Sequence, residues 1–108
     1  MRILFDHGTP RSIARSLDGH VVTVAKTRGW ERLTNGALLT VAEEAGFDLL
    51  LTTDKNMQHQ QNLAGRKIAI VVLGNPQLPV VRLYMRRIVE AVDAAQPGSY
   101  SRVEMPVG

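Results

Sequence analysis

Short apolar runs recur along the chain, and each is typical of a β-strand. Leu49, Leu50 and Leu51 form a run bounded by polar residues, which predicts a buried strand covered on both faces, as in parallel sheets. The earlier run HVVTVAK, residues 20–26, is rich in β-branched residues, which also favour strands. The expected strands are residues 3–5, 20–26, 47–53 and 67–74, with a short edge strand at 99–105.

Helical patterns separate these runs. After the Gly8-Thr9-Pro10 turn, Ile13, Ala14 and Leu17 predict a first helix, with Pro10 in its first turn and Asp18-Gly19 at its end. Residues 27–36 are expected to be irregular or a short turn of helix.

A second helix is predicted over residues 37–45, with Thr34 or Asn35 as its N-cap and Gly46 just after its end. The 3.6-residue period places four apolar side chains on its buried face and turns Glu43 and Glu44 toward solvent. These four are Leu38, Val41, Ala42 and Ala45.

The last helix is predicted over residues 79–95. Its buried side is expected to hold Val81, Met85, Ile88 and Val92, and its outer face Arg82, Arg86 and Glu90. Strand and helix therefore alternate, which predicts an α/β fold with a mostly parallel sheet. Residues 1–108 have the length of a single domain, and no internal repeat or linker is evident.

Composition narrows the class of protein. The chain has no cysteine, which excludes disulfides and thiolate chemistry and fits a reducing compartment. No apolar stretch reaches the ~20 residues of a spanning helix, and the N-terminus is unlike a signal peptide, so we expect a cytoplasmic protein without a membrane partner. The formal charge of +3 favours an anionic partner such as nucleic acid or an acidic protein.

Two aspartates stand where expected strands end. Asp6 follows the first strand and Asp54 the third, while Asn35 begins the helix that leads into the third strand and Asn56 lies just beyond Asp54. In parallel α/β sheets these positions share the carboxyl edge, and if the first and third strands are neighbours the carboxylates face each other across a crevice. The plainer interpretation is that each carboxylate or amide caps a helix or closes a turn.

Paired carboxylates repel each other unless they share a proton or a cation. Mg²⁺ or Mn²⁺ prefers oxygen ligands, so Asp6 and Asp54 are candidate metal ligands, and Asn35 and Asn56 could complete the site. Such an ion promotes phosphodiester hydrolysis. Glu43 and His7 are reserve candidates for this chemistry, and His59 lies near Asp54 in the sequence.

Basic side chains suggest a nucleic-acid substrate. Lys55, Arg11, Arg66 and Lys67 are candidates for contacts with RNA phosphates, because backbone recognition needs no sequence code. The amide-rich segment QHQQN at residues 58–62 is either a solvated loop or part of the same surface.

Three segments carry a resemblance to a known family: ILFDHGTP near the start, GWERLTNGALLTVAEEAGFDLLLTTDKN in the middle and QQNLAGRKIAIVVL after it. Together they resemble a family of small bacterial PIN-like proteins of unknown function, distant relatives of VapC-type toxin nucleases, over about residues 1–92. The resemblance implies a three-layer α/β/α PIN-like sandwich, an acidic pocket for Mg²⁺ or Mn²⁺ and metal-dependent endoribonuclease activity. It also implies a toxin-antitoxin pair with a small DNA-binding antitoxin as partner.

Within this resemblance, Asp6 matches the first-strand aspartate and Asp54 the aspartate of a TxD motif. The chain departs from the family pattern where many members carry further acids: it has His7 after Asp6, Asn35 at the start of the middle helix, and Asn56 after Asp54.

Three functional hypotheses remain. The preferred one is a hydrolase, a metal-dependent ribonuclease. The alternative is a catalytically degenerate PIN-like module that binds RNA or a protein partner, and a homodimer is open in either case. A phosphoreceiver would need a Thr or Ser after the fourth strand and a lysine after the fifth, but the chain has VVLGNP there and no lysine beyond Lys67.

Overall fold

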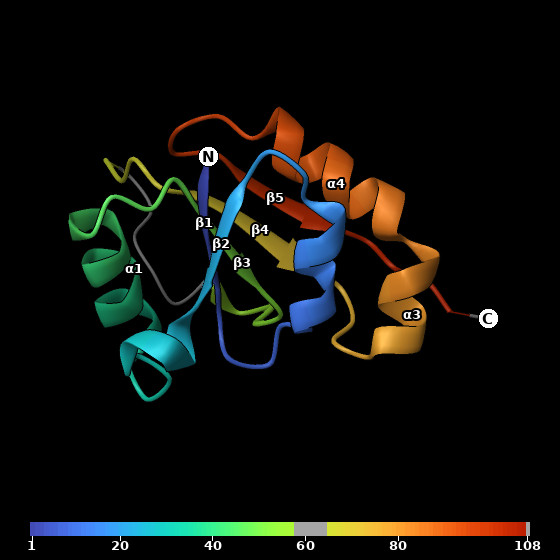
Figure 1. The fold of residues 1–108 in the computed structure, drawn as a ribbon, viewed down its shortest axis with the longest axis horizontal. Coiled ribbons are helices and arrows are strands. Elements are labelled where there is room, and N and C mark those ends of the chain that lie inside the picture. The colour runs from blue at the N-terminus through green and yellow to red at the C-terminus, as the bar shows by residue number, and fades with distance from the viewer. Residues whose placement is uncertain (58–64, 108) are drawn as a thin grey trace.

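A computed structural model describes residues 1–57 and 65–107, and at its centre lies one sheet of five parallel strands (Figure 1). The order across the sheet is β2-β1-β3-β4-β5, in which every neighbouring pair is parallel. The strands are β1 (Arg2–Phe5), β2 (Val21–Val24), β3 (Leu49–Thr52), β4 (Ala69–Leu73) and β5 (Tyr100–Val103). All four predicted strands and the edge strand are confirmed.

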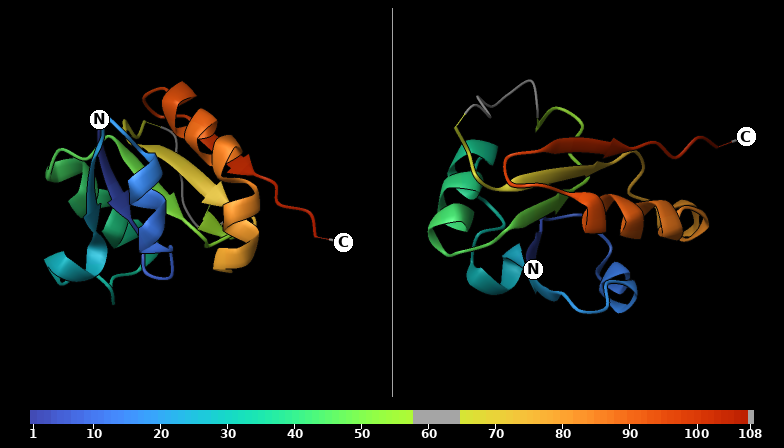
Figure 2. Two further views of the ribbon diagram at one scale, coloured as in Figure 1. Left: turned by 45° about the vertical axis from the view of Figure 1, so that its right-hand side comes forward. Right: turned by 90° about the horizontal axis from the view of Figure 1, so that it is seen from above.

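Helices cover both faces of this sheet, which makes the fold a three-layer α/β/α sandwich (Figure 2). One layer holds the 3₁₀ helix η1 (Arg11–Ser16) together with α3 (Leu78–Leu83) and α4 (Met85–Ala94). The other holds α1 (Asn35–Glu44) and the 3₁₀ helix η2 (Ala25–Arg28). The predicted parallel α/β class is confirmed.

The run of leucines in β3 follows directly from this layering. Alternate strand residues point to opposite faces, so Leu49 and Leu51 pack in the core beneath η1, α3 and α4 while Leu50 packs against α1. β1 divides in the same way, with Leu4 on the α1 side. All three leucines of β3 are fully buried, so a strand between two helical layers has no position for a polar residue before Thr52.

The point where the chain reverses its direction across the sheet lies between β1 and β3. From β1 the chain moves outward to β2 and then returns to place β3 on the other side of β1, with Ile3 paired to both Val22 and Leu49. Ligands of open α/β sheets bind at such a switch point, outside the carboxyl ends of the strands. The predicted crevice requires the first and third strands to be neighbours, and this is confirmed.

Three details of the predicted helices are wrong. The first helix is a short 3₁₀ helix and not an α-helix. Only six residues lie between Pro10 and Leu17, and short helices of this kind are often 3₁₀. The last helix is interrupted at Tyr84, whose backbone (φ −114°, ψ 17°) leaves the helical range. The Tyr84 hydroxyl donates to the Pro106 carbonyl of the C-terminal segment.

The buried face of α1 is also turned from the predicted one. Leu39 is buried with Leu38 and Ala42, while Val41 and Ala45 are half-buried, because Leu38 and Leu39 both pack in the core between α1 and the sheet. The N-cap is Thr34, whose hydroxyl accepts the backbone N–H of Ala37 as predicted. Of the helices described, none is long and apolar enough to cross a membrane.

Candidate active site

Asp6 and Asp54 lie at the carboxyl ends of the two adjacent strands at the switch point, and one hydroxyl connects them. Thr52, the last residue of β3, donates its hydroxyl hydrogen to Asp6 Oδ2 at 2.7 Å and accepts the backbone N–H of Asp54 at 3.1 Å. Thr52 is fully buried and both aspartates are half-buried. The predicted pair of carboxylates therefore belongs to one hydrogen-bonded group at one edge of the sheet.

Asn35 joins this group from α1. As the first residue of that helix, it donates from its side-chain amide to Asp54 Oδ2 at 2.7 Å. The start of α1 lies at the carboxyl edge of the sheet because the helix follows β2 and η2 and returns the chain to the beginning of β3. The structure thus confirms that Asn35 and Asp54 come together, with the amide nitrogen rather than the carbonyl oxygen facing the carboxylate.

Asn56 contacts Asp54 differently from the prediction. Its backbone N–H donates to Asp54 Oδ1 at 2.9 Å, which closes a turn after β3, and its side chain is exposed. His7 has the same relation to Asp6: its backbone N–H donates to Asp6 Oδ1 at 2.7 Å and its ring is on an exposed residue. Both residues therefore orient a carboxylate through the main chain.

The sequence pattern had not led us to predict Thr52 as a residue of the site. The signal was present: a threonine that ends a run of buried leucines cannot leave its hydroxyl without a partner, and the residues at that edge are carboxylates. Thr9 was missed in the same way. It is buried, its hydroxyl donates to the Leu51 carbonyl at 3.1 Å, and its backbone N–H donates to the Asp6 carbonyl, which fixes the turn after β1.

The donor set suits a hard divalent cation that keeps most of its water. Each of the four carboxylate oxygens of Asp6 and Asp54 accepts one hydrogen bond. A carboxylate has about four lone-pair positions, so acceptor capacity remains on both. Mg²⁺ is commonly held by one or two carboxylates plus water. In the part of the chain that the structure describes, no group of three or more acidic, histidine or cysteine side chains could hold a metal ion.

Two of the four predicted phosphate contacts lie near the aspartates. Lys55 follows Asp54 directly, and Arg11 begins η1 just after the turn that follows Asp6; both are exposed. Each aspartate of the candidate site thus has an exposed cation a few residues further along the chain.

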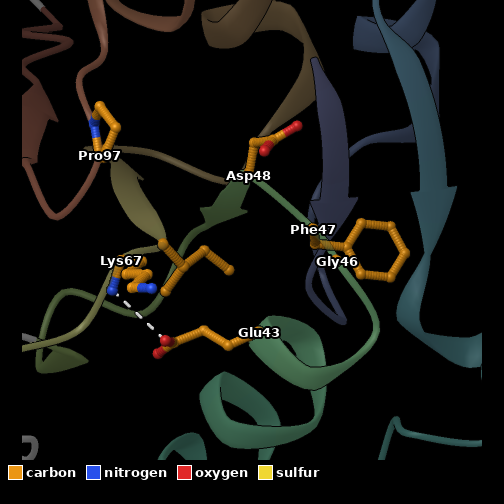
Figure 3. Close-up of a pocket in the computed structure, with 7 residues that line it drawn as sticks. Glu43, Gly46, Phe47, Asp48, Lys67 and Pro97 are labelled. Atoms are coloured by element: carbon orange, nitrogen blue, oxygen red, sulfur yellow. Dashed lines mark hydrogen bonds between the residues drawn. The ribbon is translucent and has the colours of Figure 1, made fainter.

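The other two predicted phosphate contacts, Arg66 and Lys67, do not join the aspartates, because they precede β4 and so lie at the amino edge of the sheet, opposite Asp54. Arg66 Nη1 pairs with Glu43 Oε1 at 2.9 Å, and the backbone N–H of Lys67 donates to Glu43 Oε2 (Figure 3). Glu43 is therefore neither a solvated residue nor close to Asp6 and Asp54, since its carboxylate anchors the start of β4. Glu43 therefore does not belong to the candidate site.

A hollow also lies at the amino edge. Its volume is about 340 Å³, and Figure 3 shows Glu43, Phe47, Asp48 and Lys67 among its lining side chains. Neither Asp6 nor Asp54 lines it. We assign the candidate chemistry to the switch point because Thr52 joins two carboxylates there, whereas the two acids of the hollow have separate partners: Glu43 pairs with Arg66, and Asp48 accepts the backbone N–H of Arg2.

Comparisons of this chain with protein-family models, with curated proteins and with solved structures gave no match. His59 and the QHQQN segment lie outside the described residues, so their predicted part in the site stays a prediction.

Proposed function

We propose that the protein is a metal-dependent endoribonuclease that hydrolyses phosphodiester bonds at the carboxyl edge of its sheet. One observation carries the proposal: Asp6 and Asp54 end adjacent parallel strands at the switch point, where Thr52 joins them through its hydroxyl. The resemblance of the sequence to PIN-like proteins supports the same activity.

In this proposal the protein's own residues have distinct tasks. Asp6 and Asp54 would hold Mg²⁺ or Mn²⁺ through their carboxylate oxygens. The chemistry supplied by such an ion would be polarisation of the phosphodiester and compensation of its negative charge. Thr52 and Asn35 hold the two carboxylates in fixed orientations, each through a 2.7 Å hydrogen bond. Lys55 and Arg11 attract the flanking phosphates.

Hydrogen bonds of this kind matter because they reduce the freedom of a carboxylate to rotate. A carboxylate held by a hydroxyl on one oxygen and a backbone N–H on the other presents its remaining lone pairs in one direction. The asparagine at position 35 supports Asp54 in this way, where an acid would add a further negative charge.

A second candidate function is a PIN-like module that binds RNA or a protein without cutting. The observation that favours it is the state of the aspartates, whose oxygens all accept hydrogen bonds from protein groups. The described residues also add no third acid to the pair.

The resemblance also motivates proposals about context: a cytoplasmic protein, paired with a small DNA-binding antitoxin, with homodimer formation open. The phosphoreceiver interpretation gains nothing at β4 and β5, because Gly74 follows β4 and Glu104 follows β5, where a hydroxyl and a lysine are required.

The experiment is cleavage of a labelled single-stranded RNA by the purified protein with Mn²⁺, Mg²⁺ or EDTA. We expect cutting that requires the metal and is abolished in both Asp6→Asn and Asp54→Asn. Asp18→Asn is the matched control, since this exposed aspartate lies after η1 and outside the site, and it should cut like the wild type.

Thermal unfolding of each variant separates a lost site from a lost fold. If the wild type, Asp6→Asn and Asp54→Asn cut alike, or if none cuts although all are folded, the nuclease proposal fails. RNA binding in EDTA by the uncutting wild type would then support the binding module.

A further inference from the structure

Five exposed arginines stand on the helical layer formed by η1, α3 and α4. η1 carries two of them and the consecutive helices α3 and α4 carry three, on the face opposite the buried residues Val81, Ile88 and Val92. We call this set the arginine ridge: Arg11, Arg15, Arg82, Arg86 and Arg87.

The ridge arginines lack carboxylate partners. The ion pairs in the described part of the chain are His20–Asp93, Arg66–Glu43 and Arg102–Glu104, and none involves the ridge. Arg87 alone has a described contact, with its guanidinium 5.1 Å from the centre of the Tyr84 ring. Even the i,i+4 spacing of Arg86 and Glu90 forms no ion pair. The positive charge of the ridge is therefore available to an external anion.

Charge is distributed unequally along this layer. The acidic residues of the same helices lie toward the other end: Asp18 follows η1, and Glu90 and Asp93 stand in the second half of α4, where Asp93 binds His20 at 2.8 Å. The 10 residues of α4 span about 15 Å at the usual rise of 1.5 Å per residue, so the arginines in its first turn and the acids in its second half lie at different ends.

The cationic end of the layer is the one nearest the candidate site. η1 follows β1 and α3 follows β4, so both begin at the carboxyl edge, and η1 also packs against α4 (Figures 1 and 2). β1 and β4 are the two neighbours of β3, whose end carries Asp54. The ridge therefore starts beside the aspartates and runs away from them along one face of the molecule.

We propose that the arginine ridge binds the phosphate backbone of a single-stranded RNA whose continuation enters the Asp6–Asp54 site. The identity of the ligand rests on the proposed function, while the surface itself is argued from charge. Arginine contacts phosphate with two parallel N–H donors, and such contacts position a nucleic acid without reading its sequence.

An acidic protein would also be attracted to this surface, but the ridge lacks the apolar centre of a protein interface. Leu83, at 77% exposure, is the one exposed large apolar side chain of α3 and α4. Stable protein interfaces place aromatic and aliphatic side chains at their centre. A flexible polyanion needs no such centre.

The test measures binding of a fluorescein-labelled single-stranded RNA by fluorescence anisotropy, in EDTA so that the RNA stays intact. The double variant Arg82→Gln/Arg86→Gln removes two ridge charges outside the catalytic group. Lys26→Gln/Arg32→Gln is the control, because it removes two exposed charges, one from η2 on the other layer and one from the turn after it.

We expect the ridge variant to bind RNA about tenfold more weakly than the wild type near 0.1 M salt, and its slope of log K against log salt to be smaller by about 1.4, for two lost phosphate contacts. The control should retain the wild-type slope. Circular dichroism and thermal unfolding confirm that both variants are folded.

Equal losses in the two variants, or no loss in either, overturn the proposal, as does tighter binding of polyglutamate than of RNA by the wild type. The outcome is separable from that of the nuclease proposal. Binding through the ridge without metal-dependent cutting leaves the ridge proposal intact and refutes the nuclease, whereas cutting that survives in a ridge variant with unchanged affinity refutes the ridge.

Discussion

Replacing Thr52 with valine should destabilise the protein more than any other removal of a single described threonine hydroxyl. The side chain is fully buried, and its hydroxyl both donates to Asp6 Oδ2 and accepts the Asp54 N–H. Hydrogen bonds to charged groups contribute about 1.5–3 kcal/mol, and an amide that loses its acceptor adds about 1 kcal/mol to the cost. The methyl group that valine buries returns about 0.8 kcal/mol.

The expected loss is therefore about 2–3 kcal/mol in the free energy of unfolding, measured by urea denaturation monitored through Trp30 fluorescence. Thr9→Val is the matched control. Thr9 is also buried, but its hydroxyl donates to the neutral carbonyl of Leu51, so the lost bond and the gained methyl nearly cancel and we expect a change below about 1 kcal/mol.

A double-mutant cycle of Thr52→Val with Asp6→Asn isolates the contact, and we expect a coupling energy of about 1 kcal/mol or more. A loss in Thr52→Val no larger than that in Thr9→Val, together with a coupling energy near zero, would refute the argument that this hydroxyl holds the carboxylate pair together.

Two further predictions concern the amino edge of the sheet. Arg66→Met should lower the free energy of unfolding by about 1–2 kcal/mol, because the side chains of the Arg66–Glu43 pair are only 23% and 24% exposed. The control Arg102→Met, whose partner Glu104 is 68% exposed, should change it by less than about 0.5 kcal/mol. The urea midpoints of the two variants should therefore differ, and equal midpoints would contradict the expectation. Gly46→Ala should lower Tm, measured by calorimetry, by several degrees more than Gly19→Ala. Both glycines have φ above +80°, but a Cβ at position 46 would lie 2.7 Å from Arg2 Nη1, which donates to the Ala45 carbonyl, while position 19 is open. Similar shifts in Tm would show that the Arg2 contact adjusts freely.

The sheet and its switch point could be predicted because their signals are local. A run of three leucines needs two apolar surroundings, a β-branched run favours a strand, and alternation with helices leaves a parallel sheet as the simple solution. From there, the meeting of Asp6 and Asp54 at one edge follows from topology alone. The hydrogen bonds between them do not, since they depend on the rotamer of Thr52 and on the turn that Asn56 closes.

The errors have equally specific causes. Arg66 and Lys67 were grouped with Asp54 by distance along the sequence, although a residue that precedes a parallel strand lies at the edge opposite to one that follows its neighbour. The break at Tyr84 had no local signal, because the apolar pattern continues through it. It accompanies a contact with Pro106, a residue far along the chain.

The parallel arrangement of all five strands has a consequence for how the chain acquires its structure. No strand pairs with a sequence neighbour through a hairpin: Ile3 pairs with Val22 and Leu49, and Ile70 pairs with Tyr100. Non-local pairings of this kind make folding slow relative to helical or hairpin-rich domains of similar size. During synthesis, β1 has only the edge strand β2 beside it until β3 has been made, and the outer edge of β4 stays open until Tyr100–Val103 arrives. The two aspartates therefore become neighbours only when β3 pairs with β1, and the sheet that holds them is completed only when Tyr100–Val103 adds to β4.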